Sequence, residues 1–107
     1  MPAKPNSQSS LPVRRSLREV GQHVAAWRKL RGLTQNQVAD RAGIDRKTLM
    51  RIERGDGAVS LDIVFRVLHA LGVLDGLASS LDPYESDVGR LRADDRLPDR
   101  VRPRDLG

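Results

Sequence analysis

Cysteine is absent from the 107 residues of this chain, which excludes disulfide bonds, thiol nucleophiles and cysteine-based zinc sites. Aromatic residues make up only 3% of the sequence. Its two histidines, His23 and His69, are too far apart for the spacing of a zinc finger, so we expect no metal and no other cofactor. No apolar run approaches the roughly 18 residues that cross a bilayer, and the basic N-terminus lacks the apolar segment of a secretory signal. These absences predict a small cytoplasmic protein without a membrane anchor.

Positive charge is concentrated in the first part of the chain. The formal net charge is +5, and residues 1–31 hold seven basic residues and one acidic residue. The remaining residues are close to neutral, although residues 82–107 are dense in charges of both signs. This distribution suggests an anionic partner for the first half without identifying it.

Proline, serine and hydrophobic periodicity divide the chain into three parts. Residues 1–15 contain three prolines and three serines without periodicity, which predicts a flexible, disordered arm. Residues 16–81 show repeated helical periodicity and no strand-like alternation. Residues 82–107 contain three prolines and few large apolar side chains, which predicts a tail that is partly disordered or folds on a partner.

The periodic part predicts a first helix over residues 16–31, because apolar residues fall three or four positions apart and Gly32 follows as a stop. These apolar residues are Leu17, Val20, Val24 and Trp27, and we expect them to face the core. A fourth helix is expected from Ser60 to Gly72, with its apolar face on Leu61, Val64, Leu68 and Leu71. A short fifth helix is expected over residues 74–81.

Strong start signals mark the second and third helices. Thr34 and Gln37 have the spacing of a capping box, and Asp45 is a good N-cap for a helix that ends near Gly55. Only residues 43–45 separate the two helices, and a connection this short that contains a glycine is typical of a helix-turn-helix motif. The apolar positions of the two helices would pack inside: Val38, Ala39, Ala42, Ile44, Leu49 and Ile52. The opposite side of the third helix collects Arg46, Lys47, Met50, Arg51 and Arg54.

Residues 17–73 resemble the lambda-repressor/Cro-type helix-turn-helix family, also called the XRE family. The resemblance depends on the stretch WRKLRGLTQNQVADRAGIDRKTLMRIERG and on VSLDIVFRVLHALGV after it. It implies an all-α, five-helix, lambda-repressor-like DNA-binding domain over residues 16–81, with the motif at 34–55 and a recognition helix at 45–54. It covers neither the arm nor the tail.

The resemblance also implies roles for single residues. Base-reading positions are occupied by Arg46, Lys47, Arg51 and Met50, whereas Gln35, Thr48 and Arg54 occupy positions that contact DNA phosphates. Arginine and lysine can donate two hydrogen bonds to guanine, and a methionine can contact a thymine methyl group. Members of the family often pair an arginine of the first helix with a glutamate at the end of the third, which assigns a structural ion pair to Arg28 and Glu53. Asp45 would serve mainly as a cap, because a carboxylate near phosphate is unfavourable.

Two functions remain open at this point. The first is a sequence-specific regulator, acting as a homodimeric repressor or autorepressor on a palindromic operator in double-stranded DNA. The second is an antitoxin similar to the HipB type, whose tail binds and neutralises a toxin while the helix-turn-helix represses the operon. No Ser/His/Asp arrangement or glycine-rich phosphate loop is present, so we expect no enzyme.

Assembly and the tail give two further expectations. Family members dimerise after the fourth helix, and Val73, Leu74, Leu77 and Leu81 form an apolar strip there. This strip would pack partly on the core and partly on a second subunit, or, in the alternative, on the core alone. In the tail, Val88 and Leu91 are three residues apart, so a short helix would present both to a partner. Other large apolar side chains of the tail are Tyr84, Leu97 and Val101, while Pro98 and Pro103 would keep its end extended.

Overall fold

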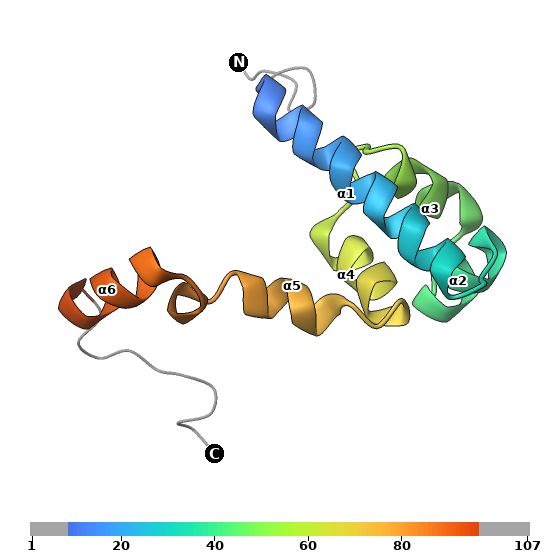
Figure 1. Cartoon of the computed structure of the whole chain (residues 1–107). Helices are drawn as coiled ribbons and strands as arrows, with labels where there is room; N and C mark the ends of the chain where they lie inside the picture. The colour runs from blue at the N-terminus through green and yellow to red at the C-terminus, as the bar shows by residue number, and fades with distance from the viewer. Residues whose placement is uncertain (1–8, 97–107) are drawn as a thin grey trace. The chain divides into compact units, whose positions relative to one another are not determined.

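The computed structural model describes residues 9–96, and every regular element within them is a helix. The chain divides into two compact units after Leu74. The first unit contains α1 (Leu11–Leu30), α2 (Gln35–Ala42), α3 (Arg46–Glu53) and α4 (Leu61–Ala70), and the second contains most of α5 (Leu74–Ser80), the 3-10 helix η2 (Pro83–Glu85) and α6 (Asp87–Arg96) (Figure 1). The all-α fold class predicted from the sequence is confirmed.

Helices α2 and α4 begin where the sequence predicts, because their N-caps form as expected. The Thr34 hydroxyl accepts a hydrogen bond from the Gln37 backbone N–H at 3.1 Å, and the Gln37 side chain accepts one from the Thr34 N–H at 2.9 Å. At α4, the Ser60 hydroxyl accepts from the Ile63 N–H at 3.2 Å. Each such cap satisfies a backbone donor at a helix start and is worth about 1 kcal/mol.

A tight left-handed turn joins α2 to α3. Gly43 has φ 71°, a conformation that favours glycine because it lacks a Cβ. The Gly43 N–H donates to the Asp40 carbonyl at 3.2 Å and the Ile44 N–H to the Ala39 carbonyl at 3.0 Å. These bonds satisfy the last carbonyls of α2 and fix the direction in which α3 leaves the turn.

The core of the first unit lies between the four helices. Its buried members are Val24, Val38, Ala39, Ala42, Leu49, Ile52, Val67, Leu68 and Leu71. All the interior positions predicted for the motif are buried except Ile44, which is half-buried against the same cluster. At the ends of α1 and α4, the Arg31 Nε donates to the Leu71 carbonyl at 2.6 Å and joins the two helices.

Helix α1 begins at Leu11 and not at the predicted Ser16, so the predicted disordered arm is wrong for residues 11–15. Pro12 lies in the first helical turn, where its missing N–H would have no partner in any case. The prolines and serines of residues 1–15 are typical of a disordered segment, so the sequence alone predicts too late a start for this helix. Residues 1–8 of the predicted arm lie outside the described residues. The first turns of α1 extend past the other helices of this unit (Figure 1).

Three side chains predicted to face the core are exposed instead. Val24 of α1 is buried, but Val20 and Trp27 on the same stripe are 46% and 40% exposed, and the Arg31 guanidinium lies 5.2 Å from the centre of the Trp27 ring. In α4, Leu61 is 67% exposed at the first position of the helix. Helical periodicity identifies residues that share a face, but only the part of that face opposite other helices becomes buried.

The second unit contains more helix than the sequence predicts for its tail. Helix α5 ends one residue before the predicted boundary, and the Asp82 carboxylate caps η2 by accepting from the Tyr84 N–H at 2.9 Å. Helix α6 contains Val88 and Leu91, which are 65% and 75% exposed, as expected for a short helix that presents both. Leu97, Val101, Pro98 and Pro103 lie outside the described residues. None of the helices within residues 9–96 combines the length and apolarity needed to cross a membrane.

Candidate nucleic-acid interface

Asp45 starts α3 and holds its first turn in place. One oxygen of its carboxylate accepts a hydrogen bond from the Thr48 N–H at 2.7 Å. Hydrogen bonding by the Thr48 side chain, together with that backbone bond, lowers the pKa of Asp45 below its ordinary value, and the charges of Lys47 and Arg51 contribute less. The carboxylate therefore acts as a charged cap at the helix N-terminus, where negative charge is favourable.

The two sides of α3 have opposite roles. Leu49 and Ile52 are buried in the core. On the other side the two basic residues of the first turn, Arg46 and Lys47, are exposed, and Arg54 is exposed at the end of the helix. Between them Thr48, Met50 and Arg51 are partly exposed. The predicted site residues of α3 thus lie on its accessible side, and the core holds the helix from behind.

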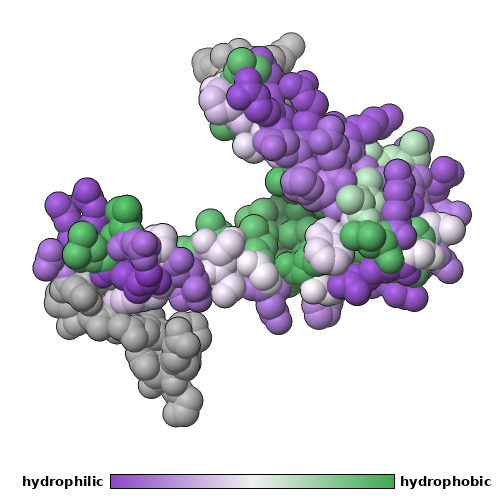
Figure 2. Space-filling view, viewed as in Figure 1, coloured by the Kyte–Doolittle hydropathy of each residue, from purple (hydrophilic) through white to green (hydrophobic). Residues whose placement is uncertain are grey.

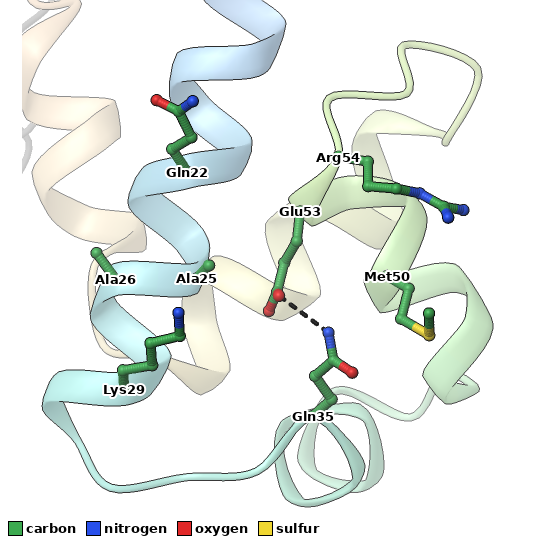
Figure 3. A pocket seen from close by; sticks show the side chains of 8 residues that line it. All are labelled: Gln22, Ala25, Ala26, Lys29, Gln35, Met50, Glu53 and Arg54. Atoms are coloured by element: carbon green, nitrogen blue, oxygen red, sulfur yellow. Dashed lines mark hydrogen bonds between the residues drawn. The ribbon is translucent and has the colours of Figure 1, made fainter.

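A chain of hydrogen bonds connects α1 with both ends of α3. The Arg28 Nε donates to Glu53 Oε2 at 2.8 Å, and a terminal guanidinium nitrogen donates to Oε1 at 3.2 Å, so the ion pair expected from the resemblance is present. Glu53 Oε1 also accepts from Gln35 Nε2 at 3.0 Å (Figure 3). Gln35 Oε1 in turn accepts from Arg46 Nε at 3.3 Å. The remaining nitrogen of the Arg28 fork donates to the Leu33 carbonyl at 3.1 Å.

This chain determines how Arg46 and Gln35 can act. Gln35 uses its amide nitrogen for Glu53 and its amide oxygen for Arg46, so its side chain is engaged within the protein. A phosphate contact at this position would depend on the backbone N–H in the first turn of α2. Arg46 is held through Nε, which leaves both terminal nitrogens of its guanidinium for an external acceptor.

Arg51 has a partner of its own in the free protein. Its Nε donates to Asp56 Oδ2 at 2.8 Å, while Asp56 Oδ1 accepts from the Ala58 N–H at 2.8 Å. The Ala58 bond, followed by the Arg51 side chain, lowers the pKa of Asp56 below its ordinary value. Because Arg51 and Asp56 are 40% and 34% exposed, this ion pair is open to solvent, and breaking it in favour of another acceptor costs little free energy.

An open groove of about 530 Å³ lies between α1 and α3. It is lined by Gln22, Ala25, Ala26 and Lys29 of α1, by Met50, Glu53 and Arg54 of α3, and by Gln35 (Figure 3). The small side chains of Ala25 and Ala26 leave it open. The contribution of α1 was not predicted from the sequence, although the spacing of Gln22 and Lys29 by seven residues would have placed them on one face.

Comparisons with known proteins agree with this geometry. Residues 24–74 match the helix-turn-helix family model, a span that includes α2, α3 and α4. An uncharacterized HTH-type transcriptional regulator of Methanothermobacter thermautotrophicus is 42% identical over 45 residues, which are 42% of this chain and 65% of that protein. The chain thus spans slightly less than two thirds of the length of this relative. The family-model match, residues 24–74, includes every residue of the hydrogen-bond chain.

Proposed function

We propose that this chain, whose residues 24–74 match the helix-turn-helix family model, is an XRE-type transcriptional regulator that recognises a specific sequence in double-stranded DNA. The observation that carries this proposal is the accessible side of α3. Its basic residues project from a helix that is fixed by the core and by the bonds among Arg28, Glu53 and Gln35. A rigid helix of this size fits the major groove of B-DNA, which is about 12 Å wide.

The site residues divide into two groups in this proposal. Base edges are read by Arg46, Lys47, Arg51 and Met50, and phosphates are contacted by Gln35, Thr48 and Arg54. The terminal nitrogens of Arg46 can donate together to O6 and N7 of a guanine, because Nε is already bonded to Gln35. Arg54 neutralises phosphate and gains affinity by releasing counterions.

The active form in this proposal is a dimeric repressor, or autorepressor, of a palindromic operator. Two copies related by a two-fold axis would read half-sites about 10 base pairs apart. Val73 and Leu74 are half-buried against the core of the first unit, whereas Leu77 and Leu81 are 36% and 74% exposed. Exposure thus increases along the strip, which supports packing of its first residues on the core and leaves the later ones for a second subunit.

Selection of DNA from random duplexes with the purified chain tests this function. We expect enrichment of a sequence with two related half-sites. Arg46→Ala should then weaken binding to that sequence by about 1–3 kcal/mol and relax the preference at one base pair in each half-site. Arg66→Ala is the matched control, because Arg66 lies on α4, has a side chain that is 53% exposed and, within residues 9–96, forms an ion pair only with Asp62. Equal losses on selected and random DNA would contradict the base-reading role of Arg46.

An antitoxin role is the second candidate, and α6 is the observation that favours it. Val88 and Leu91 of this helix are largely exposed, as expected for apolar side chains that become buried when a protein partner binds. In this version the second unit binds and neutralises a toxin while the first unit represses the operon. Co-expression with the product of a neighbouring reading frame tests it, and failure of the chain to bind that product would contradict it.

A further inference from the structure

The face of α1 that lines the groove continues beyond it toward the N-terminus. Gln22 and Lys29 lie on this face. Counting back from Gln22 by four and then by three residues gives Arg18 and Arg15, so both arginines share the same side of the helix. In Figure 2 the visible side chains of the N-terminal half of α1 are mostly hydrophilic.

Close backbone contacts show where this basic face lies relative to α3. A Cβ on Gly21 would lie 2.6 Å from the carbonyl oxygens of Ile52 and Glu53, and a Cβ on Gly55 would lie 2.9 Å from the Arg18 Cα. The C-terminal end of α3 is therefore packed against residues 18–21 of α1. Arg54 is the C-cap of α3 and lines the groove together with Gln22 of α1. The turns of α1 before Arg18 therefore extend beyond Arg54, on the side of the candidate interface.

The charges of this face have no acidic partners among the described residues. Arg15 and Arg18 are exposed, and no ion pair within residues 9–96 includes either of them. Glu19 is the sole acid of α1, and it follows Arg15 by one turn without pairing with it. Two adjacent unpaired guanidinium groups favour a polyanion, and the nearest one that the site implies is the DNA backbone.

We infer that Arg15 and Arg18 form a second phosphate-binding site, which contacts the DNA backbone just outside the half-site read by α3. Arg15 precedes Gln22 by seven residues, or about 10 Å along the helix. This distance corresponds to about three base pairs along one strand. The extended first turns of α1 lengthen the contact with DNA and read no base. This inference rests on the proposed function.

The test measures affinity against salt concentration, using the duplex selected with the full chain. Each lost phosphate contact should lower the slope of log K against log[salt] by about 1, so Arg15→Gln/Arg18→Gln should lower it by about 2. Arg15→Lys/Arg18→Lys should keep the slope, because a phosphate contact at a helix surface depends on charge. Arg66→Gln on α4 should also leave it unchanged.

The length of the duplex provides the second arm. A duplex extended on both sides should show the full difference between the wild-type chain and the glutamine variant. A duplex trimmed to the selected base pairs should lose it, because the flanking phosphates are gone. If the wild-type chain binds the duplex and the glutamine variant keeps its slope, or if trimming does not matter, this inference alone is wrong. If the wild-type chain binds no duplex above background, the proposed function is wrong as well.

Discussion

Arg28 and Glu53 form the most enclosed of the ion pairs described above, with side chains that are 13% and 9% exposed. At such burial the attraction within the pair competes with the cost of removing both charges from water. The pair therefore matters less for net stability than for holding the end of α3 against α1. Its second contact, from Glu53 to Gln35, extends that fixed geometry to the start of α2.

Removing one member of this pair should be much more costly than removing both. Arg28→Met leaves the Glu53 carboxylate largely buried without its guanidinium, and we expect the free energy of unfolding to fall by about 3 kcal/mol. Arg28→Met/Glu53→Met should recover much of that loss. Urea unfolding of the two variants and the wild-type chain measures both effects. A single-variant loss below about 1 kcal/mol would contradict the buried-pair interpretation.

The free energy of unfolding should depend on pH partly through Asp45, the N-cap of α3. The pKa of Asp45 is lower in the folded chain than its ordinary value of 3.8. The ionised carboxylate therefore contributes its full stabilisation at pH values above 3.8, and this stabilisation is lost as the pH falls through the pKa of the folded chain. Asp45→Asn keeps a capping side chain without a titrating charge. The difference in unfolding free energy between the two chains should therefore be constant near neutral pH and shrink only below about pH 4. Urea unfolding at a series of pH values measures it, and a difference that changes between pH 5 and 7 would point to another group.

At the scale of elements, the start of a helix can be predicted wherever its signals are local. Thr34, Asp45 and Ser60 each cap a helix through a backbone N–H three residues later, so the sequence itself contains the whole interaction. The start of α1 was missed because Ser10 makes no side-chain cap bond and Pro12 looked like an interruption. The exposure of Trp27 was missed because burial depends on which helices lie opposite.

The candidate site was predictable to a similar degree. Helical spacing alone placed Arg46, Lys47 and Arg54 on the side of α3 opposite the core. The bonds of Gln35 to Glu53 and Arg46 join residues 18 and 11 positions apart, and no periodicity within one helix connects them. These bonds depend on the angle between α2 and α3, which is set by the folded turn at Gly43. The spacing of residues within either helix does not give that angle.

The crossing of α1 and α3 gives a sharp test at this scale. Gly21 lies within α1, and an added Cβ would come 2.6 Å from two backbone oxygens of α3, which cannot move aside as a flexible side chain could. Gly21→Ala should therefore lower the free energy of unfolding by about 1–3 kcal/mol, although alanine favours helix formation. Gly76→Ala in α5 is the matched control, because a Cβ there meets nothing within 4 Å, and it should leave stability equal or raise it by up to about 1 kcal/mol. Thermal or urea unfolding distinguishes the two, and equal effects would contradict the close crossing.

At the scale of the whole molecule, the division after Leu74 separates the candidate interface from the tail. Every residue of the hydrogen-bond chain belongs to the first unit, and the exposed Val88 and Leu91 belong to the second. The proposed functions assign DNA binding to the first unit and capture of a protein partner to the second, so each should be lost without the other.

Deletion of residues 82–107 should separate these two roles. It leaves the first unit and α5 intact, so affinity for the selected duplex should stay within a few-fold of the full chain. The same deletion should abolish capture of any protein partner that depends on α6. Fluorescence anisotropy with labelled duplex measures the first effect and affinity co-purification the second. A truncated chain that retains every partner of the full chain would show that the tail has no such role.

The three hydrogen-bonded caps of the first unit also bear on how fast it folds. Each cap closes a loop of only three residues, and the helices follow one another through short turns. Chains with such local contacts fold on the order of microseconds to milliseconds. When reclosing is this much faster than cleavage, proteolysis follows the equilibrium population of the open form. The loss of about 3 kcal/mol expected for Arg28→Met would therefore lower the steady-state amount of the protein in a cell by raising the population that proteases can cleave.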